Sequence, residues 1–293
     1  MEMFHNSSSN RLSSHPIPED KEEMISLWQT TFHDSDEFAD LFFNRVYKPE
    51  NALVIKKDNK IISALQMIPY EIKTTEGIIP SAYICGVCTL TSERGKGFMS
   101  ILMNEAFSVM QQRGYGIATL IPAHPWLFDI YKKLGYTNPI NYSNEIFYNN
   151  DKTQFSEYNF IPYTNEYFHY FDKKQREHQC AVLHNAYDIE NIIRDLKYDN
   201  GNAWIALHND IPAGIALVKP DSEKIITIKE ILYNNTQAKE ALISYSLNLH
   251  NAQTAKVRIP PTTNCNIYNY GLACIINKKI TDISNIYMAL MLD

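Results

Sequence analysis

The stretch that decides the fold is V-C-T-L-T-S-E-R-G-K-G, residues 87–97, which leads into a helical pattern over residues 98–112. It joins the end of an apolar run to two closely spaced glycines and then to an amphipathic segment. This order predicts a buried strand, a tight turn and a helix. Because the first N–H groups of a helix have no partner within the helix, an anion can bind there. The sequence therefore predicts an α/β protein with an anion-binding turn.

The turn itself, Arg94-Gly95-Lys96-Gly97, fits neither of two widespread phosphate loops. It is not G-x-x-x-x-G-K-S/T, and it is not G-x-G-x-x-G because Ser100 occupies the place of the third glycine. Glycines let an anion approach the backbone closely, and an arginine adds a charged hydrogen-bond donor. On these four residues alone, an ordinary connection between a strand and a helix remains an alternative.

The segments around the turn complete one α/β arrangement. Before it we expect a helix over residues 19–31, a second helix capped by Ser35, and a hairpin around Asp58-Asn59. The expected strands and helices that follow these two helices span residues 52–57, 61–68, 82–90, 98–112, 117–121, 125–134 and 136–148.

The same order of elements recurs in the second half of the chain. The repeated hairpin, strand, helix and strand span residues 203–207, 211–218, 225–232, 236–250 and 255–259. Each series ends at a proline, Pro122 or Pro260, so we infer a duplicated fold. In place of the glycine turn the second copy has Y-N-N-T-Q-A-K, residues 233–239, and we expect no cofactor there.

We therefore expect a flexible arm over residues 1–15, a first domain over 16–150, a linker over 151–165 and a second domain over 166–293. The linker is polar and rich in tyrosine. The second domain is expected to open with helices near residues 166–185 and 188–197, ahead of the repeated series.

Composition excludes several function classes. Of 293 residues, 45% are hydrophobic, and the net charge of −6 comes without a basic block. Nucleic-acid binding normally needs a basic surface, so we expect no nucleic-acid partner. The N-terminus lacks the apolar core of a signal peptide, and no apolar run is long enough to cross a bilayer. These features predict a cytoplasmic protein without a membrane partner.

The five cysteines are odd in number and scattered, which favours free thiols in a reducing compartment. Cys85 and Cys88 form a C-x-x-C pattern, but positions three apart on a strand face opposite sides. A redox or zinc site needs both sulfurs on one side or a second ligand pair. We therefore interpret these cysteines as structural and predict no metal.

Two motifs resemble those of the GNAT acetyltransferases. Residues 94–99, R-G-K-G-F-M, are similar to the family's Q/R-x-x-G-x-G/A turn, with Met99 where glycine or alanine is usual. Residues 131–136, Y-K-K-L-G-Y, are similar to its Y-x-x-x-G-F/Y motif. The R-x-x-G turn followed by apolar residues looks most like the multi-domain Eis-type branch. The chain is too short for the sterol-carrier-like domain that such proteins usually carry.

The resemblance implies two tandem GNAT-like domains, each a mixed and mostly antiparallel sheet with a splayed central strand pair flanked by helices. It also implies acetyl-CoA as the acyl donor, with pantetheine inserted beside Val87, Cys88 and Thr89. His124 stands in place of the family's asparagine and would still donate a hydrogen bond to the cofactor. The residues that would hold the pyrophosphate are Arg94, Gly95, Lys96, Gly97, Phe98, Met99 and Ser100.

The resemblance further implies acetyl transfer to a primary amine of a small molecule or peptide. Tyr131 occupies the position that protonates the departing thiolate, and a tyrosine that merely packs the short helix is the alternative. In Eis-type enzymes the terminal carboxylate is the base, which here is Asp293; a last strand of the second sheet is the other interpretation. Glu71, His124 and a water are further candidates, because Ser81 stands where some members carry glutamate.

A non-catalytic acyl-CoA-binding or regulatory protein is the competing function class. Met99, Ser81 and the missing asparagine favour it, whereas the turn and Tyr131 favour an enzyme. Neither the acceptor nor the oligomeric state, including a homo-oligomer, is defined by the sequence. The aromatic residues that would line an acceptor cleft, or simply form core, are Trp28, Phe32, Phe38, Phe42 and Tyr83.

Overall fold

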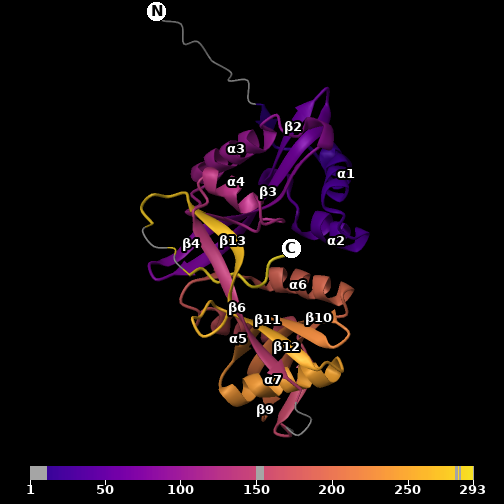
Figure 1. Ribbon diagram of the computed structural model, residues 1–293, viewed down its shortest axis with the longest axis vertical. Coiled ribbons are helices and arrows are strands. Elements are labelled where there is room, and N and C mark those ends of the chain that lie inside the picture. The colour runs from indigo at the N-terminus through magenta and orange to yellow at the C-terminus, as the bar shows by residue number, and fades with distance from the viewer. Residues whose placement is uncertain (1–11, 150–154, 281–282, 284, 293) are drawn as a thin grey trace, which may run out of the picture. The chain divides into compact units, whose positions relative to one another are not determined.

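The computed structural model describes residues 12–149, 155–280, 283 and 285–292 of a mixed α/β chain (Figure 1). These residues form two compact units. Unit 1 contains the described part of Met1–Ile68 together with Tyr83–Arg113, and unit 2 contains Pro69–Ala82 and the described part of Gly114–Asp293. No helix in these ranges is long and apolar enough to cross a membrane.

Unit 1 contains the sheet order β1-β2-β3-β4. Its elements are β1 (Ser13–Ser14), α1 (Lys21–Phe32), α2 (Asp36–Leu41), β2 (Ala52–Lys57), the first part of β3 (Lys60–Thr74), the last part of β4 (Gly77–Thr89) and α3 (Phe98–Gln112). Asp58 and Asn59 have φ angles of 51° and 61°, the left-handed pair that a two-residue hairpin favours. The Ser35 hydroxyl accepts a hydrogen bond from the Phe38 N–H at 3.1 Å. The predicted hairpin and helix cap are both confirmed.

The predicted flexible arm over residues 1–15 needs a correction where the structure describes it. Ser13 and Ser14 pair antiparallel with Ile55 and Val54 of β2. The backbone, rather than the serine side chains, makes this pairing, so a polar composition does not reveal it. Residues 1–11 lie outside the described residues.

Unit 2 contains a longer run of paired strands. Its order is β5 (Ile117–Leu120), β13 (Ile267–Ile275), β6 (Asn138–Tyr148), β12 (Thr254–Ile259), β11 (Ile225–Tyr233), β10 (Ile211–Ser222), β9 (Asn202–His208) and β7 (Tyr158–Pro162). Strand β13 pairs antiparallel with both β5 and β6, and β6 also pairs with β12. Strands on both sides of residue 150 are therefore joined by backbone hydrogen bonds, and the predicted domain boundary is not a break in the sheet.

Two predicted segments near that boundary are wrong in part. The linker over residues 151–165 contains β7, which pairs antiparallel with β9. The helix expected over residues 166–185 is α5 (Phe168–Gln175) followed by β8 (Ala181–Leu183), which pairs with β3. A run of three buried apolar residues is too short for periodicity to distinguish a strand from a helix. Helix α6 (Ala186–Tyr198) begins after Asn185.

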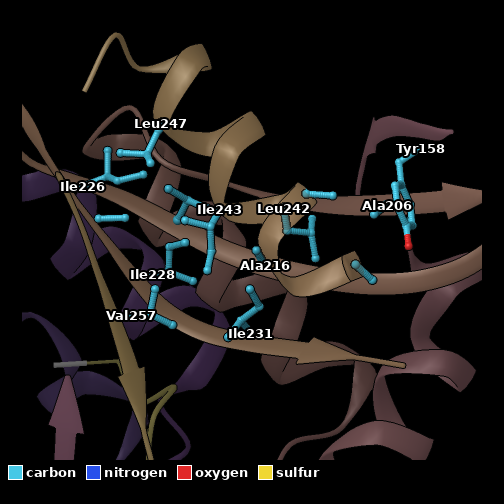
Figure 2. Packing of buried hydrophobic residues seen from close by; sticks show 14 of the residues in the cluster. Tyr158, Ala206, Ala216, Ile226, Ile228, Ile231, Leu242, Ile243, Leu247 and Val257 are labelled. Carbon is cyan, nitrogen blue, oxygen red and sulfur yellow. The ribbon is translucent and has the colours of Figure 1, made fainter. Parts of the chain in front are cut away.

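The second copy has the predicted order of hairpin, strand, helix and strand. Helix α7 (Thr236–Leu249) packs on β11 and β12, and Figure 2 shows Leu242, Ile243 and Leu247 among the strand residues of this core. Strands β11 and β12 pair in parallel, with Ile225 opposite Thr254. This apolar packing stabilises the copy without a glycine turn.

Candidate functional site

The turn before α3 leaves backbone N–H groups available. Gly95 and Gly97 have φ angles of 78° and 84°, and a Cβ atom added to either would meet no heavy atom within 4 Å. Glycine is favoured at both positions because the backbone is left-handed, and not because a side chain would clash. Gly97 is the N-cap of α3 and has no side chain to accept a helix N–H. The N–H groups of Phe98, Met99 and Ser100 therefore lack an intrahelical acceptor, as an anion site requires.

Charged side chains surround the turn. The Arg94 Nε atom donates to the Thr89 carbonyl at 3.1 Å, which places the guanidinium by the end of β4. Glu93 accepts from Lys96 Nζ at 2.8 Å and from Lys57 Nζ at 3.0 Å. The hydrogen bond from Lys96, followed by that from Lys57, lowers the pKa of the Glu93 carboxyl. Arg94, Lys57 and Lys96 outnumber the carboxylates of Glu93 and Asp58, and this balance favours an anion.

Sequence reasoning missed Lys57 and Glu93. Lys57 lies 36 positions before Glu93, and its place beside the turn follows from the pairing of β2 with β3 and of β3 with β4. The residue types alone, a lysine in a hairpin and a glutamate in a turn, carry no distinctive signal.

Strand β4 bends at Gly86, just before the predicted cofactor residues. Gly86 has a φ of 59°, and a Cβ atom there would lie 2.2 Å from Cζ3 of Trp28. Past this bend Val87 and Thr89 are half-buried, whereas Cys88 faces the core. The Cys88 carbonyl already accepts a hydrogen bond from the Ser63 hydroxyl at 2.7 Å.

Burial keeps the thiols of Cys85 and Cys88 protonated. It raises the pKa of the Cys88 thiol to about 12 and raises that of Cys85 as well. Because a neutral thiol is a poor nucleophile and metal ligand, both residues fit a packing role. All five cysteines are free thiols.

The aromatic residues proposed for an acceptor cleft pack together as core. Trp28 and Phe42 are buried with their ring centroids 4.6 Å apart, and Phe32 and Phe38 contact this pair while half-buried. Tyr83 is also buried. Trp28, Phe42 and Tyr83 are therefore core residues, which was the alternative to a role in an acceptor cleft.

Tyr131 lies in unit 2 on the short helix α4 (Leu127–Lys133). Its ring meets that of Tyr136 edge-on at 6.0 Å, and the residue is 6% exposed. Burial raises the pKa of its hydroxyl to about 12. Tyr131 therefore keeps its proton at neutral pH, which a proton donor requires.

The remaining predicted site residues differ in how far the structure defines them. His124 is exposed, and its ring stacks on Trp126 with centroids 6.2 Å apart. Glu71 is exposed at the unit 2 end of β3, and Ser81 is buried. Asp293 lies outside the described residues, so the structure assigns no base there.

The glycine turn and the tyrosine motif both fall within a stretch that matches a known family. Residues 16–138 match the family model described as an acetyltransferase (GNAT) domain. The chain therefore contains a GNAT-type domain. The match confirms the resemblance carried by the turn and by the motif that begins at Tyr131. A search of curated proteins finds no significant match.

Solved structures extend the likeness beyond this GNAT domain. GCN5-related N-acetyltransferases from Anabaena variabilis and Kribbella flavida are 15% and 14% identical, with TM-scores of 0.75 and 0.72. Eis1 from Mycobacterium abscessus is 11% identical, with a TM-score of 0.68. Each covers 90% of this chain, and the chain covers 72%, 70% and 74% of theirs. At these identities the likeness shows a shared fold, and it includes the second copy.

Proposed function

We propose that the protein is an acyltransferase that moves an acetyl group from acetyl-CoA to a primary amine of a small molecule or peptide. The observation that carries this proposal is the uncapped start of α3 behind two left-handed glycines, within a GNAT domain. In the proposal Arg94–Ser100 bind the pyrophosphate, and the backbone of Val87–Thr89 pairs with pantetheine. His124 adds a hydrogen bond to the cofactor.

In the proposed reaction, the neutral amine attacks the thioester carbonyl, a C–N bond forms and the C–S bond breaks. The amine loses one proton, and the CoA thiolate gains one. We assign the proton that the thiolate gains to Tyr131, whose hydroxyl is protonated at neutral pH. Tyr131 then regains a proton from solvent.

The base stays unassigned in this proposal. Strand β4, G-I-I-P-S-A-Y-I-C-G-V-C-T, carries no carboxylate, and Ser81 is buried within it. Glu71, His124 and an ordered water are the candidates among the described residues. A base is needed to take the proton that the amine loses, either from the substrate ammonium before attack or from the tetrahedral intermediate after it.

The lack of a carboxylate on β4 also favours a second candidate, an acyl-CoA-binding protein without turnover. The two functions share cofactor binding and differ only in chemistry. Isothermal titration with acetyl-CoA tests the shared part, and a thiol-release assay over a panel of amines tests the rest. Failure to bind millimolar acetyl-CoA would contradict both functions. Binding without thiol release on any amine would support the second.

A further inference from the structure

Unit 2 contains a cavity of about 410 Å³ that belongs to neither GNAT motif. It is formed by the end of β3, by α5, by β8 and by the start of α6. Its walls combine aromatic rings with carboxylates. Because the cavity uses residues from both copies of the fold, no single sequence motif marks it.

Carboxylates give the cavity a net negative charge. Arg176 Nε contacts the two oxygens of Asp172 at 3.0 Å and 2.9 Å, so these two charges balance each other. Glu71 and Asp188 also line the cavity. Glu71 contributes to the raised pKa of Arg176, after Asp172. With two carboxylates beyond the balanced pair, the cavity favours a cation.

Asp188 is held in place at the edge of the cavity. Its Oδ2 atom accepts a hydrogen bond from the Asn185 N–H at 2.9 Å, as part of the cap of α6. Burial raises the pKa of the Asp188 carboxyl to about 6. A bound cation would favour the ionised form and offset this cost of burial.

Aromatic rings form the apolar part of the wall. Tyr70 meets the His184 ring edge-on, with centroids 5.4 Å apart, and Phe168 also lines the cavity. The faces of tyrosine and phenylalanine rings attract cations and bury hydrocarbon. The wall therefore suits an ammonium group that carries a small apolar body.

His184 adds a buried ring to the wall. The residue lines the cavity, is 5% exposed, and is fixed by its backbone, whose N–H and carbonyl both bond to the Gln175 side chain at 2.9 Å and 2.8 Å. Burial lowers the pKa of its imidazole to about 3, so the ring is neutral. Within the described chain its Nδ1 atom has no hydrogen-bond partner.

We propose that this cavity is a binding site for a primary ammonium on a small apolar body, held by Glu71 and Asp188 against the rings of Tyr70, Phe168 and His184. The inference does not depend on acyl transfer in the first copy. The site would recognise its ligand by positive charge, by N–H donors and by a flat or short hydrocarbon portion.

Three probes with the same ring and different charge test the site on the full chain. They are phenethylamine, 2-phenylethanol and 3-phenylpropionate, titrated at pH 7 while the NMR signals of the His184 and Tyr70 rings are followed. We expect saturable shifts with phenethylamine, binding weaker by about fivefold or more with the alcohol, and no binding of the carboxylate. Equal binding of the amine and the alcohol, or shifts that do not reach His184, would overturn the proposal.

Charge-removing variants locate the site. Glu71→Gln and Asp188→Asn keep the side-chain shape, and an asparagine oxygen still accepts the Asn185 N–H. Each should weaken phenethylamine binding by about fivefold. Glu157→Gln removes the same charge from an exposed position outside this cavity and should leave binding unchanged. If all three variants weaken binding equally, the effect comes from overall charge, and the proposed site is contradicted. If a variant fails to fold, the series of three probes on the unmodified protein still tests the site.

Discussion

The two copies of the fold begin their main helices in opposite ways. In the second copy the Asn235 side chain accepts a hydrogen bond from the Ala238 N–H at 2.9 Å and so caps α7. In the first copy Gly97 occupies the corresponding N-cap of α3, with a φ of 84° and no side-chain acceptor. A helix start that is satisfied by its own chain holds the fold together, whereas one left open is available to a ligand.

The turns before these helices differ in the same sense. Asn234 donates from Nδ2 to the Pro212 carbonyl at 3.1 Å and accepts from the Tyr170 hydroxyl at 3.2 Å. These bonds tie the second turn to β10 and α5. Around Gly95 and Gly97, by contrast, added Cβ atoms would meet open space. The second turn is therefore satisfied by its own asparagines, whereas the first is left open, as the proposed anion site requires.

The largest expected effect concerns Tyr131 on α4, the short helix that follows β5. Tyr131→Phe should lower kcat by about 100-fold, because the leaving thiolate loses its proton donor, and should leave acetyl-CoA affinity within about twofold. Steady-state kinetics and isothermal titration measure the two quantities. Tyr245→Phe removes a hydroxyl from α7 of the second copy and serves as the control. Unchanged turnover in Tyr131→Phe would remove it as the acid.

The bend in β4 has a stability consequence. Gly86→Ala should lower the free energy of unfolding by about 2–4 kcal/mol, because the methyl group overlaps Trp28 and the backbone is left-handed. Urea denaturation measures this change. Gly95 has a similar left-handed φ, but a Cβ atom there would meet no close atom. Gly95→Ala should therefore lower the free energy of unfolding by only about 1–2 kcal/mol. Equal losses would show that contact with Trp28 does not matter.

Removing the cap of the second copy should affect stability and not the cofactor. Asn235→Ala should lower the free energy of unfolding by about 1 kcal/mol, since the Ala238 N–H loses its acceptor. Its acetyl-CoA affinity should match that of the unmodified protein in isothermal titration. A loss of affinity would mean that the second copy takes part in cofactor binding.

The smallest expected effect is a gain in affinity. Glu93→Gln removes the carboxylate that pairs with Lys57 and Lys96, so both ammonium groups can face a phosphate. Acetyl-CoA should bind about threefold more tightly at low salt, and the gain should shrink at high salt. Titration at two ionic strengths measures it, with Glu157→Gln as a matched loss of charge. Weaker binding in Glu93→Gln would show that the carboxylate supports the turn.

Local patterns were enough to predict the parts of the fold that depend on neighbouring residues. The glycine turn and the bounds of α3 follow from residues that are adjacent in sequence. The same holds for the cap at Ser35 and for the hairpin at Asp58-Asn59. Each depends on a conformational preference or on hydrogen bonds within a few positions. The repeated order of elements could be predicted for the same reason.

Long-range pairing is what the sequence did not reveal. Strand β13 pairs with β5 and β6 although more than one hundred positions separate them, as the pairing of Leu272 with Leu120 shows. The Lys57–Glu93 contact and the overlap of Gly86 with Trp28 likewise depend on the packed structure. Periodicity describes the faces of an element and not its partner, so these features required the fold.

We propose above all that one open helix start, in the first copy, binds acetyl-CoA. Isothermal titration of the full chain with acetyl-CoA tests it directly, using the unmodified protein, Gly97→Val and Asn235→Ala. We expect one equivalent of acetyl-CoA per chain. Its affinity should be unchanged by Asn235→Ala and about tenfold or more weaker in Gly97→Val, where a β-branched residue disfavours the left-handed conformation of the turn. Full affinity in a folded Gly97→Val protein, or two equivalents per chain, would contradict it.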